Sequence, residues 1–374
     1  MFLSGKGKRM QKIVQHFKFV GEYAGADQLT SGHINDTYVV VFVGEDGQKR
    51  RYILQRINRN VFKNPGLLMD NIVRVTRHLQ KRIVENGGDP ARETMNVIST
   101  RGGNSYHRTV AGDCWRAYDF VEGTRSYQKV EDPLQFYHAG RVVGRFQMLL
   151  DDFPAESLHE TIPDFHDTPK RLNDLFQAVE KNSVGRADIV AAEIDFVKKR
   201  AADTKVLVDL LAGGKLPLRV IHNDTKLNNV LIDDETGEGI CLIDLDTVMP
   251  GLSLYDFGDA IRYGSSTAAE DEPDLSRVKM DMGLYEQFCR GYLQETAHFL
   301  TPLEIDYLPF SARLITLECG IRFLTDYIEG DLYFKTQRKD HNLDRARTQF
   351  RLVSDMENNM KQMQAIVEKY SGAG

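Results

Sequence analysis

The chain has 374 residues, 41% of them hydrophobic and 27% charged, which is the composition of a soluble globular protein long enough for two domains. Its 48 Lys and Arg residues are outnumbered by 54 Asp and Glu residues, giving a net charge of −6, so it lacks the basic excess of a dedicated nucleic-acid-binding protein. The four cysteines are scattered and form no CxxC pair, which is typical of a reducing compartment. The chain has no apolar run long enough for a membrane span and no signal-peptide core. We therefore predict a cytoplasmic protein with no nucleic-acid, membrane or obligate protein partner.

Strand signals dominate the first third of the chain. Four runs rich in β-branched and aromatic residues predict strands at 37–43, 51–57, 96–100 and 114–121. Glu45-Asp-Gly47 between the first two runs is typical of a hairpin turn. The segment 66–84 carries apolar residues at helical spacing. We therefore predict an N-terminal lobe over residues 1–121, with a small, mostly antiparallel sheet and one helix.

From residue 122 onward the pattern becomes helical. Apolar residues three or four positions apart predict helices at 136–150 and 350–367, and Asp167-Thr-Pro169 is typical of a helix start. One short exception, residues 218–246, reads as strand, irregular polar loop, strand, turn and strand. A polar loop set among strands in a helical domain is a usual place for chemistry. We expect residues 122–374 to form a larger, mostly helical lobe.

The polar loop of this exception holds the residue types needed to transfer a phosphoryl group from a nucleotide. It reads His222-Asn-Asp-Thr-Lys-Leu-Asn-Asn229, and Asp244 closes an apolar strand after it. The order His-x-Asp-x-Lys-x-x-Asn, then Asp, matches the catalytic loop and the metal-binding Asp of kinases. The transition state of phosphoryl transfer spreads negative charge over oxygens, so positioning and charge neutralisation dominate its catalysis.

Each residue type in this set has an expected role. Asp224 accepts a hydrogen bond from the acceptor hydroxyl as the base, and the Lys226 ammonium reaches the γ-phosphate. Asn229 and Asp244 are hard oxygen ligands for Mg²⁺, which takes few protein ligands and fills the rest of its shell with phosphate and water. His222 is expected to hold the loop backbone. A single such Asp or Asn would be merely a turn residue, whereas the ordered set predicts a kinase-type site.

A second triplet, Asp256-Phe-Gly258, spells the metal-binding motif of protein kinases. It follows Pro250-Gly251 instead of a strand and opens a helical stretch. Asp244 fits the metal role better, so we expect Asp256 to be a helix N-cap or a brace for the loop. Asp246 is either a second or outer carboxylate of the metal site, or a hydrogen-bonded or solvent-facing structural residue.

The nucleotide side of the site has a weaker signature. Residues 29–38 are a candidate loop over the phosphates but contain one glycine, and Gln55 lies where a protein kinase has its third-strand lysine. The segment 66–84 contains no glutamate, so the usual Lys–Glu pair is missing and the mode of holding the α- and β-phosphates stays open. The backbone of Phe120 and Val121, where the sheet gives way to the helical lobe, is the predicted adenine-binding hinge.

The segments 222–229 and 243–247 together resemble the aminoglycoside phosphotransferase/choline kinase superfamily. The resemblance implies an α+β, two-lobe protein-kinase-like fold with a small antiparallel-sheet N-terminal lobe and a large, mostly helical C-terminal lobe. It implies ATP and Mg²⁺ as cofactors, with Asp224 as base and Asn229 and Asp244 as metal ligands.

Further segments resemble the sugar kinases of this superfamily that act on N-acetylhexosamines. They lie at 32–35, 52–55, 165–169, 256–259, 318–324 and 327–334. This resemblance implies ATP-dependent phosphorylation of the anomeric hydroxyl of N-acetylglucosamine or N-acetylgalactosamine in amino-sugar salvage. It also implies Gln55 as a normal third-strand residue, and His33, Arg322 and Tyr333 as residues of the sugar pocket.

Alternatives stay open at these positions. Arg322 could instead form a salt bridge to Asp326 or Glu329 on the same helix, Tyr333 could be packing, and His33 could cap its own turn. Four acidic residues near this segment, Glu318, Asp326, Glu329 and Asp331, would suit a cationic acceptor. The alternative functions are therefore a choline, homoserine or aminoglycoside kinase, or a nucleotide-binding regulator without catalysis, which the missing Lys–Glu pair would favour.

Overall fold

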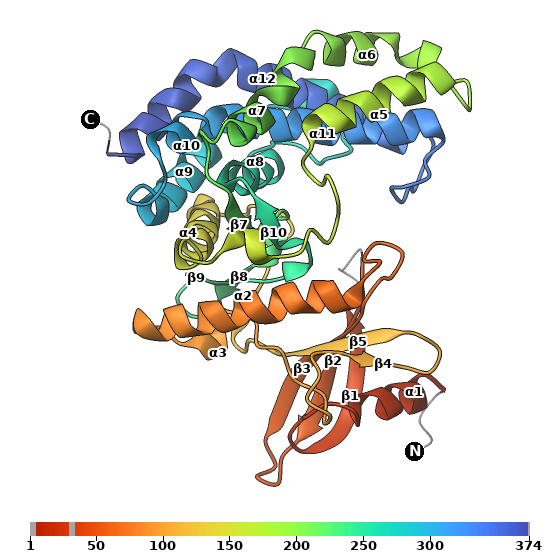
Figure 1. The fold of residues 1–374 in the computed structure, drawn as a ribbon, viewed down its shortest axis with the longest axis vertical. Helices are drawn as coiled ribbons and strands as arrows, with labels where there is room; N and C mark the ends of the chain where they lie inside the picture. The colour runs from red at the N-terminus through yellow and green to blue at the C-terminus, as the bar shows by residue number, and fades with distance from the viewer. Residues whose placement is uncertain (1–4, 30–33, 373–374) are drawn as a thin grey trace.

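The N-terminal lobe is built on a five-stranded antiparallel sheet (Figure 1). A computed structural model of the protein describes residues 5–29 and 34–372. The strands, in spatial order, are β1 (Glu22–Leu29), β2 (Asp36–Val43), β3 (Lys49–Arg56), β5 (Cys114–Asp119) and β4 (His107–Arg108). Strands 37–43, 51–57 and 114–121 are thus confirmed to within a few residues, and Gly47, at a φ of 74°, closes the predicted hairpin turn.

The predicted strand at 96–100 is wrong. This segment makes only isolated bridges, from Val97 to Tyr118 and from Thr100 to Phe17. The Asn96 side chain donates hydrogen bonds to the carbonyls of Pro90 and Thr94, which turns the chain locally. The segment lies antiparallel beside β5, where the Asp119 amide donates to the Asn96 carbonyl at 3.0 Å and the Ile98 amide donates to the Ala117 carbonyl at 2.9 Å, but it does not form a continuous strand.

The long helix of this lobe lies between its sheet and the C-terminal lobe (Figure 1). Helix α2 (Pro65–Glu85) begins after Asn64, whose side chain accepts hydrogen bonds from two backbone amides of the first turn. Its buried face, which includes Ile72 and Leu79, belongs to the same hydrophobic core as the C-terminal lobe. The shorter helices α1 (Gly5–Val14) and α3 (Pro90–Glu93) complete the lobe. Helix α2 thus confirms the prediction at 66–84 and joins the two lobes.

The C-terminal lobe is mostly helical. Its helices are α4 (Pro133–Leu149), α5 (Thr168–Lys181), α6 (Ala191–Lys198), α7 (Val206–Ala212), α8 (Ser253–Gly264), α9 (Met282–Thr296), α10 (Pro302–Asp306), α11 (Leu308–Glu329) and α12 (His341–Tyr370). Short 3₁₀ turns lie at Ala155–Ser157, Ala187–Val190, Ala201–Lys205, Leu227–Asn229, Leu245–Thr247 and Leu275–Arg277. Helices α4, α5 and α12 confirm the predicted helical stretches.

Two small antiparallel sheets lie beneath these helices, on the side of the N-terminal lobe (Figure 1). One consists of β6 (Thr124–Arg125), β8 (Val230–Asp233) and β9 (Gly239–Leu242), and the other pairs β7 (Arg219–Ile221) with β10 (Met249–Gly251). Strands β7, β8 and β9 are the three strands predicted within 218–246. The structure confirms the two-lobe α+β fold.

The packing of α8 explains the glycine of the Asp256-Phe-Gly258 triplet. A Cβ atom at Gly258 would lie 2.7 Å from the Ser311 carbonyl oxygen of α11, which is closer than van der Waals contact permits. Phe257 is fully buried among aromatic rings. Phe257 and Gly258 of the triplet therefore serve helix packing in this fold.

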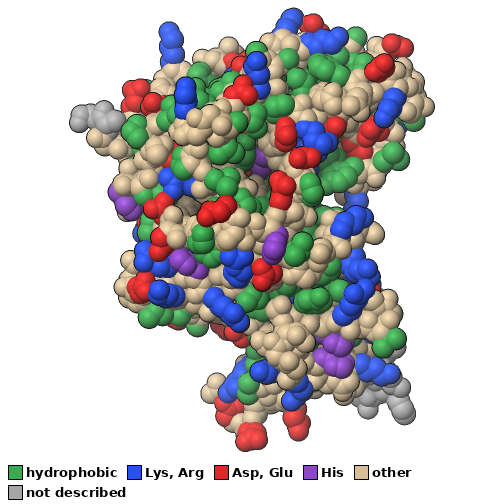
Figure 2. All heavy atoms as spheres, viewed as in Figure 1, with side chains coloured by type: hydrophobic (Ala, Val, Ile, Leu, Met, Phe, Trp, Pro, Cys, Tyr) green, Lys and Arg blue, Asp and Glu red, His purple; other side chains and the backbone are tan. Residues whose placement is uncertain are grey.

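The surface mixes charges of both signs. On the face shown in Figure 2, basic and acidic side chains are interspersed over both lobes. Within the described ranges 5–29 and 34–372, no helix is both long enough and apolar enough to cross a bilayer.

Candidate active site

A large cavity lies between the two lobes. Its volume is about 1640 Å³, and its wall is formed by strands of the N-terminal sheet, by the segment that joins the lobes and by the polar loop after β7. Seven of the predicted site residues line it: Gln55, Phe120, Val121, Asp224, Lys226, Asn229 and Asp244. Arg322 and Tyr333 are not among its wall residues, and His33 lies outside the described residues.

The loop after β7 is fixed by a histidine at its start. The Nε2 atom of His222 lies 2.9 Å from the carbonyl oxygen of Ile243, and its Nδ1 atom accepts a hydrogen bond from the Asp224 backbone amide at 3.2 Å. In this arrangement Nε2 is the donor of the ring and Nδ1 is the acceptor. His222 therefore holds the loop backbone against the segment that follows β9, as expected from the sequence.

Helix α8 holds the other side of the same loop. The Asp256 carboxylate accepts hydrogen bonds from the backbone amides of His222 and Asn223 at 2.9 and 2.7 Å. One turn later, the Asp259 carboxylate accepts a hydrogen bond from the backbone amide of Thr225 at 3.1 Å. Asp256 is fully buried and does not line the cavity. It is the expected loop brace, whereas the N-cap of α8 is Leu252.

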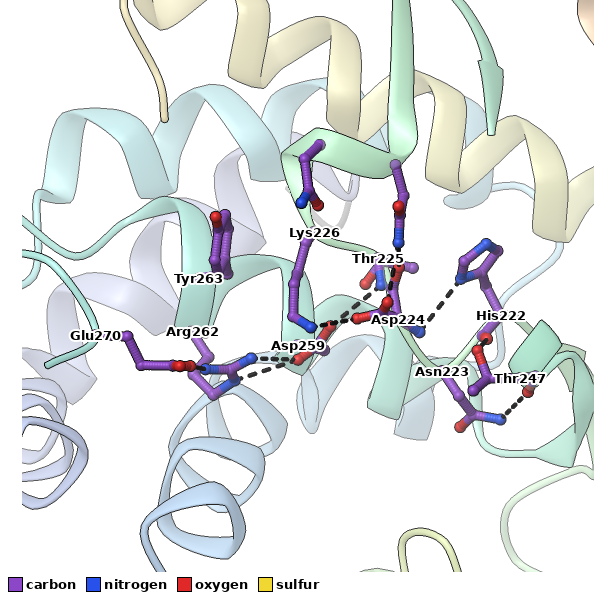
Figure 3. Close-up of polar contacts among 12 residues, drawn as sticks. His222, Asn223, Asp224, Thr225, Lys226, Thr247, Asp259, Arg262, Tyr263 and Glu270 are labelled. Atoms are coloured by element: carbon purple, nitrogen blue, oxygen red, sulfur yellow. Dashed lines mark hydrogen bonds and ion pairs between the residues drawn. The ribbon is translucent and has the colours of Figure 1, made fainter. Parts of the chain in front are cut away.

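The Lys226 side chain of the loop points to the Asp224 carboxylate (Figure 3). The Lys226 ammonium lies 2.6 Å from its Oδ1 atom, and the Asn229 amide donates to its Oδ2 atom at 3.0 Å. Burial alone would raise the pKa of Asp224, but the Lys226 charge and these hydrogen bonds outweigh burial and lower it. Asp224 is therefore an ionised carboxylate, the form that accepts a hydroxyl proton.

Asp244 has a different electrostatic environment. Burial, reinforced by the neighbouring carboxylates of Asp246 and Asp224, raises its pKa to about 7. Its backbone is left-handed, with φ 63° and ψ 58°, a conformation that costs a non-glycine residue roughly 1–2 kcal/mol. A cation beside this carboxylate would remove the electrostatic cost of its ionisation.

The donor set suits Mg²⁺. Strand pairing places the two candidate ligands together, because the Ile243 amide donates to the Asn229 carbonyl oxygen at 2.8 Å. The Asn229 amide nitrogen bonds to Asp224, which leaves its amide oxygen for a cation. Within residues 5–29 and 34–372 there is no cluster of three or more His, Cys, Asp or Glu residues arranged for a metal. Two protein oxygens are what Mg²⁺ uses when phosphates complete its shell.

The third-strand position contains an unexpected arginine partner. Gln55 accepts a hydrogen bond at 3.0 Å from the Nε atom of Arg116, which lies opposite it in the β3–β5 register. Arg116 is fully buried and forms an ion pair with Asp246, so Asp246 is a paired, hydrogen-bonded residue and does not face solvent. The sequence analysis missed Arg116. Its signal was a charged residue in the middle of an otherwise apolar and aromatic strand.

Arg322 on α11 is placed between aromatic rings. Its guanidinium carbon lies 5.5 Å from the Phe165 ring centre and 5.7 Å from that of Phe334. The alternative of a salt bridge to Asp326 is wrong, because the Asp326 carboxylate instead accepts hydrogen bonds from the backbone amides of residues 332–334. The alternative salt bridge to Glu329 is also wrong, since no ion pair joins it to Arg322 in the described part of the chain.

Tyr333 lies on the segment after α11. Its side chain is 66% exposed, so it does not pack in the core. The nearby Glu318 carboxylate, which the sequence analysis assigned to no partner, is bound to His166 Nδ1 at 2.8 Å and to the Thr168 hydroxyl at 2.6 Å. Both partners lie in the segment 165–169.

Comparison with known proteins gives the same architecture. A model of the phosphotransferase enzyme family matches residues 26–300. The solved microcompartment-associated aminopropanol kinase is 17% identical, with a TM-score of 0.63 over 96% of this chain and 98% of that one. The amicoumacin kinase hAmiN, in complex with AMP-PNP and Ca²⁺, is 14% identical, with a TM-score of 0.58 over 96% and 94% of the two chains.

A choline kinase from Cryptosporidium parvum is 15% identical, with a TM-score of 0.51 over 94% of this chain and 93% of that one. At these identities the likenesses to solved structures establish the fold.

Proposed function

The chain belongs to the phosphotransferase enzyme family, and from this premise we propose that it transfers the terminal phosphoryl group of ATP to the anomeric hydroxyl of N-acetylglucosamine or N-acetylgalactosamine. The observation that carries the phosphotransfer chemistry is the meeting of Asp224, Lys226, Asn229 and Asp244 in one interlobe cavity. All four groups are the types that phosphoryl transfer needs.

The proposed mechanism assigns the chemistry to these side chains. The ionised Asp224 accepts a hydrogen bond from the acceptor hydroxyl and orients its oxygen toward the phosphorus atom. The Lys226 ammonium, which pairs with Asp224, neutralises charge on the transferred group. Asn229 and Asp244 would hold Mg²⁺, which supplies further charge neutralisation on the phosphates when it is bound. The same complete set argues against a regulator without catalysis.

We place the adenine of ATP against the segment that joins the lobes. The Val121 carbonyl oxygen accepts a hydrogen bond from the Thr124 hydroxyl at 2.8 Å. Because this oxygen already has a partner, the proposed contact to the adenine base is made by the Val121 amide nitrogen. The Phe120 ring lies 4.0 Å from the Arg51 guanidinium, on the rim of the same cavity. We propose this segment as the hinge, with the lobes divided into residues 1–121 and 122–374.

The surroundings of Arg322 support a neutral sugar acceptor. An acetamido sugar needs a few fixed donors and acceptors and an apolar face for its ring, and a site that hydrogen-bonds the substrate rejects analogues strongly. Arg322 presents a guanidinium flanked by Phe165 and Phe334, and the exposed Tyr333 follows in the same segment. We propose that Arg322 and Tyr333 bind the sugar, together with His33.

The acidic residues near this segment argue against a cationic acceptor. Glu318 is bound by His166 and Thr168, Asp326 by backbone amides, and Asp331 by Arg186 at 2.6 Å. Three of the four carboxylates that would attract choline or an aminoglycoside therefore already have partners.

A substrate panel tests the proposal. Purified protein with ATP and MgCl₂ is assayed for ADP release with N-acetylglucosamine, N-acetylgalactosamine, glucose, choline, aminopropanol, homoserine and an aminoglycoside. We expect turnover on the two N-acetylhexosamines, with the phosphate at C1 by NMR of the product. The matched control is methyl N-acetylglucosaminide, whose blocked anomeric oxygen should abolish turnover. Preferential turnover of any amine, or turnover of the methyl glycoside, would contradict the sugar assignment.

A further inference from the structure

Two side chains of the N-terminal lobe meet on one buried carboxylate of the C-terminal lobe. Arg116 of β5 forms an ion pair with Asp246, and the Asn35 amide donates to the Asp246 Oδ2 atom at 2.7 Å. Asp246 is 3% exposed and follows the proposed metal ligand Asp244 by two residues. A contact between residues 211 positions apart in sequence thus ties the lobes together beside the reaction centre.

Asn35 stands at the end of the loop that joins β1 to β2. Its side-chain oxygen accepts the Asn58 backbone amide at 2.9 Å, and the Asn58 side chain donates to the Ile34 carbonyl at 3.1 Å. Asn35 and Ile34 both line the interlobe cavity. The end of this loop is therefore held from two sides, by the catalytic lobe through Asp246 and by the segment that follows β3.

Arg116 is itself held by the sheet. Its Nε atom donates to Gln55, and the Gln55 amide donates to the Thr37 hydroxyl at 3.1 Å. A continuous chain of side-chain hydrogen bonds and one ion pair runs from β2 across β3 and β5 to Asp246, and returns to Asn35, the residue before β2. Because the Arg116 guanidinium and the Asp246 carboxylate are both buried, their ion pair is shielded from water and strong.

We propose that Asp246 is a positioning residue: through Asn35 it fastens the cavity wall just before β2, at Ile34 and Asn35, to the catalytic lobe beside the nucleotide phosphates, and Arg116 keeps its carboxylate in place. This network provides the link between sheet and phosphate site that the lysine–glutamate pair provides in protein kinases. The inference rests on the proposed use of a nucleoside triphosphate and is independent of the acceptor's identity.

Two Asn35 substitutions test this inference without disturbing the buried core. Asn35→Ala removes the bond to Asp246, and Asn35→Asp places a like charge against it. The matched control is Asp36→Ala, at the next residue and the first of β2, which removes a half-buried ion pair to Arg56. The affinity for ADP and for AMP-PNP is measured by calorimetry in MgCl₂ without acceptor, and the Michaelis constant for ATP with the acceptor found in the panel.

We expect Asn35→Ala to weaken nucleotide binding about tenfold, the effect of losing a bond to a charged group, and Asn35→Asp to weaken it further. The Michaelis constant for the acceptor and the Mg²⁺ concentration for half-maximal rate should stay close to those of Asp36→Ala. In the double variant with Asp246→Asn, the Asn35→Ala effect on nucleotide affinity should become smaller, because asparagine keeps one acceptor oxygen but removes the charge that strengthens this bond.

Nucleotide affinities of the Asn35 variants within twofold of the control would overturn the inference. So would additive effects of Asn35→Ala and Asp246→Asn, or an Asp246→Asn variant whose main defect is an increased Mg²⁺ requirement, since Asp246 would then be a metal ligand. Because nucleotide binding is measured without acceptor, failure of the sugar assignment gives a different result, namely normal nucleotide affinity with no turnover of N-acetylhexosamines.

Discussion

The most decisive substitution is Asp256→Asn, because it separates a loop brace from a metal ligand. The Asp256 carboxylate is fully buried and accepts three hydrogen bonds, from the amides of His222 and Asn223 and from the Gln147 side chain at 2.9 Å. An asparagine retains one acceptor oxygen and turns an NH₂ group toward at least one of these donors. The change keeps the volume of the side chain and removes its charge.

The expected loss of stability follows from these contacts. A hydrogen bond to a charged group contributes about 1.5–3 kcal/mol, and a neutral one about 1 kcal/mol. In Asp256→Asn, one hydrogen bond is lost with its donor left buried, and the other two are weakened. Burial of the charged carboxylate is unfavourable and raises the pKa of Asp256. Removal of that charge therefore offsets part of the loss in stability. We expect a net destabilisation of about 2–4 kcal/mol, which lowers the thermal midpoint by several degrees.

The matched control is Asp224→Asn, the same chemical change in the loop that Asp256 braces. Asp224 is partly exposed to the cavity, so its thermal midpoint should stay near that of the parent while the turnover number falls by orders of magnitude. Differential scanning calorimetry and initial rates across a range of Mg²⁺ concentrations separate the two variants. Asp256→Asn with a parental midpoint and an increased Mg²⁺ requirement would refute the assignment of Asp256 as a brace.

Three further predictions concern the acceptor, the metal and pH. Arg322→Lys should raise the Michaelis constant for the sugar about tenfold with that for ATP unchanged, because an ammonium cannot present the planar donors of a guanidinium; equal effects on both constants would contradict sugar binding. EDTA should abolish turnover, and Asn229→Ala should raise the Mg²⁺ concentration for half-maximal rate; an unchanged requirement in this variant would remove Asn229 from the metal site. Burial alone would raise the pKa of Glu304, but hydrogen bonds from Arg219, the Thr301 amide and Ser253 lower it. This contribution to stability is present above the unfolded value near 4.5 and is lost as pH falls through the depressed pKa. The Glu304→Gln variant should therefore have a lower thermal midpoint than the parent at pH 7, and the difference between the two midpoints should become smaller below about pH 4.5. A difference that does not change with pH would contradict the lowered pKa of Glu304.

The sequence alone determined the parts of this protein in which chain neighbours are also spatial neighbours. The spacing of the His222–Asn229 loop and Asp244 along the chain is enough to group them, because strands β8 and β9 form a hairpin that brings the two segments back together. The amphipathic spacing at 66–84 likewise identified α2, since one buried face is a property of the helix itself.

Only the tertiary structure decided the contacts between residues far apart in the chain. Arg116 and Asn35 contact Asp246 because the two lobes pack against each other. The local sequence around either residue does not indicate which distant residue is its partner. The same holds for Arg322, whose neighbour Phe165 comes from a distant segment. It also holds for residues 96–100, which pair with β5 only at isolated bridges. Periodicity and spacing report local geometry, whereas the pairing of a buried charge depends on which distant surface folds against it.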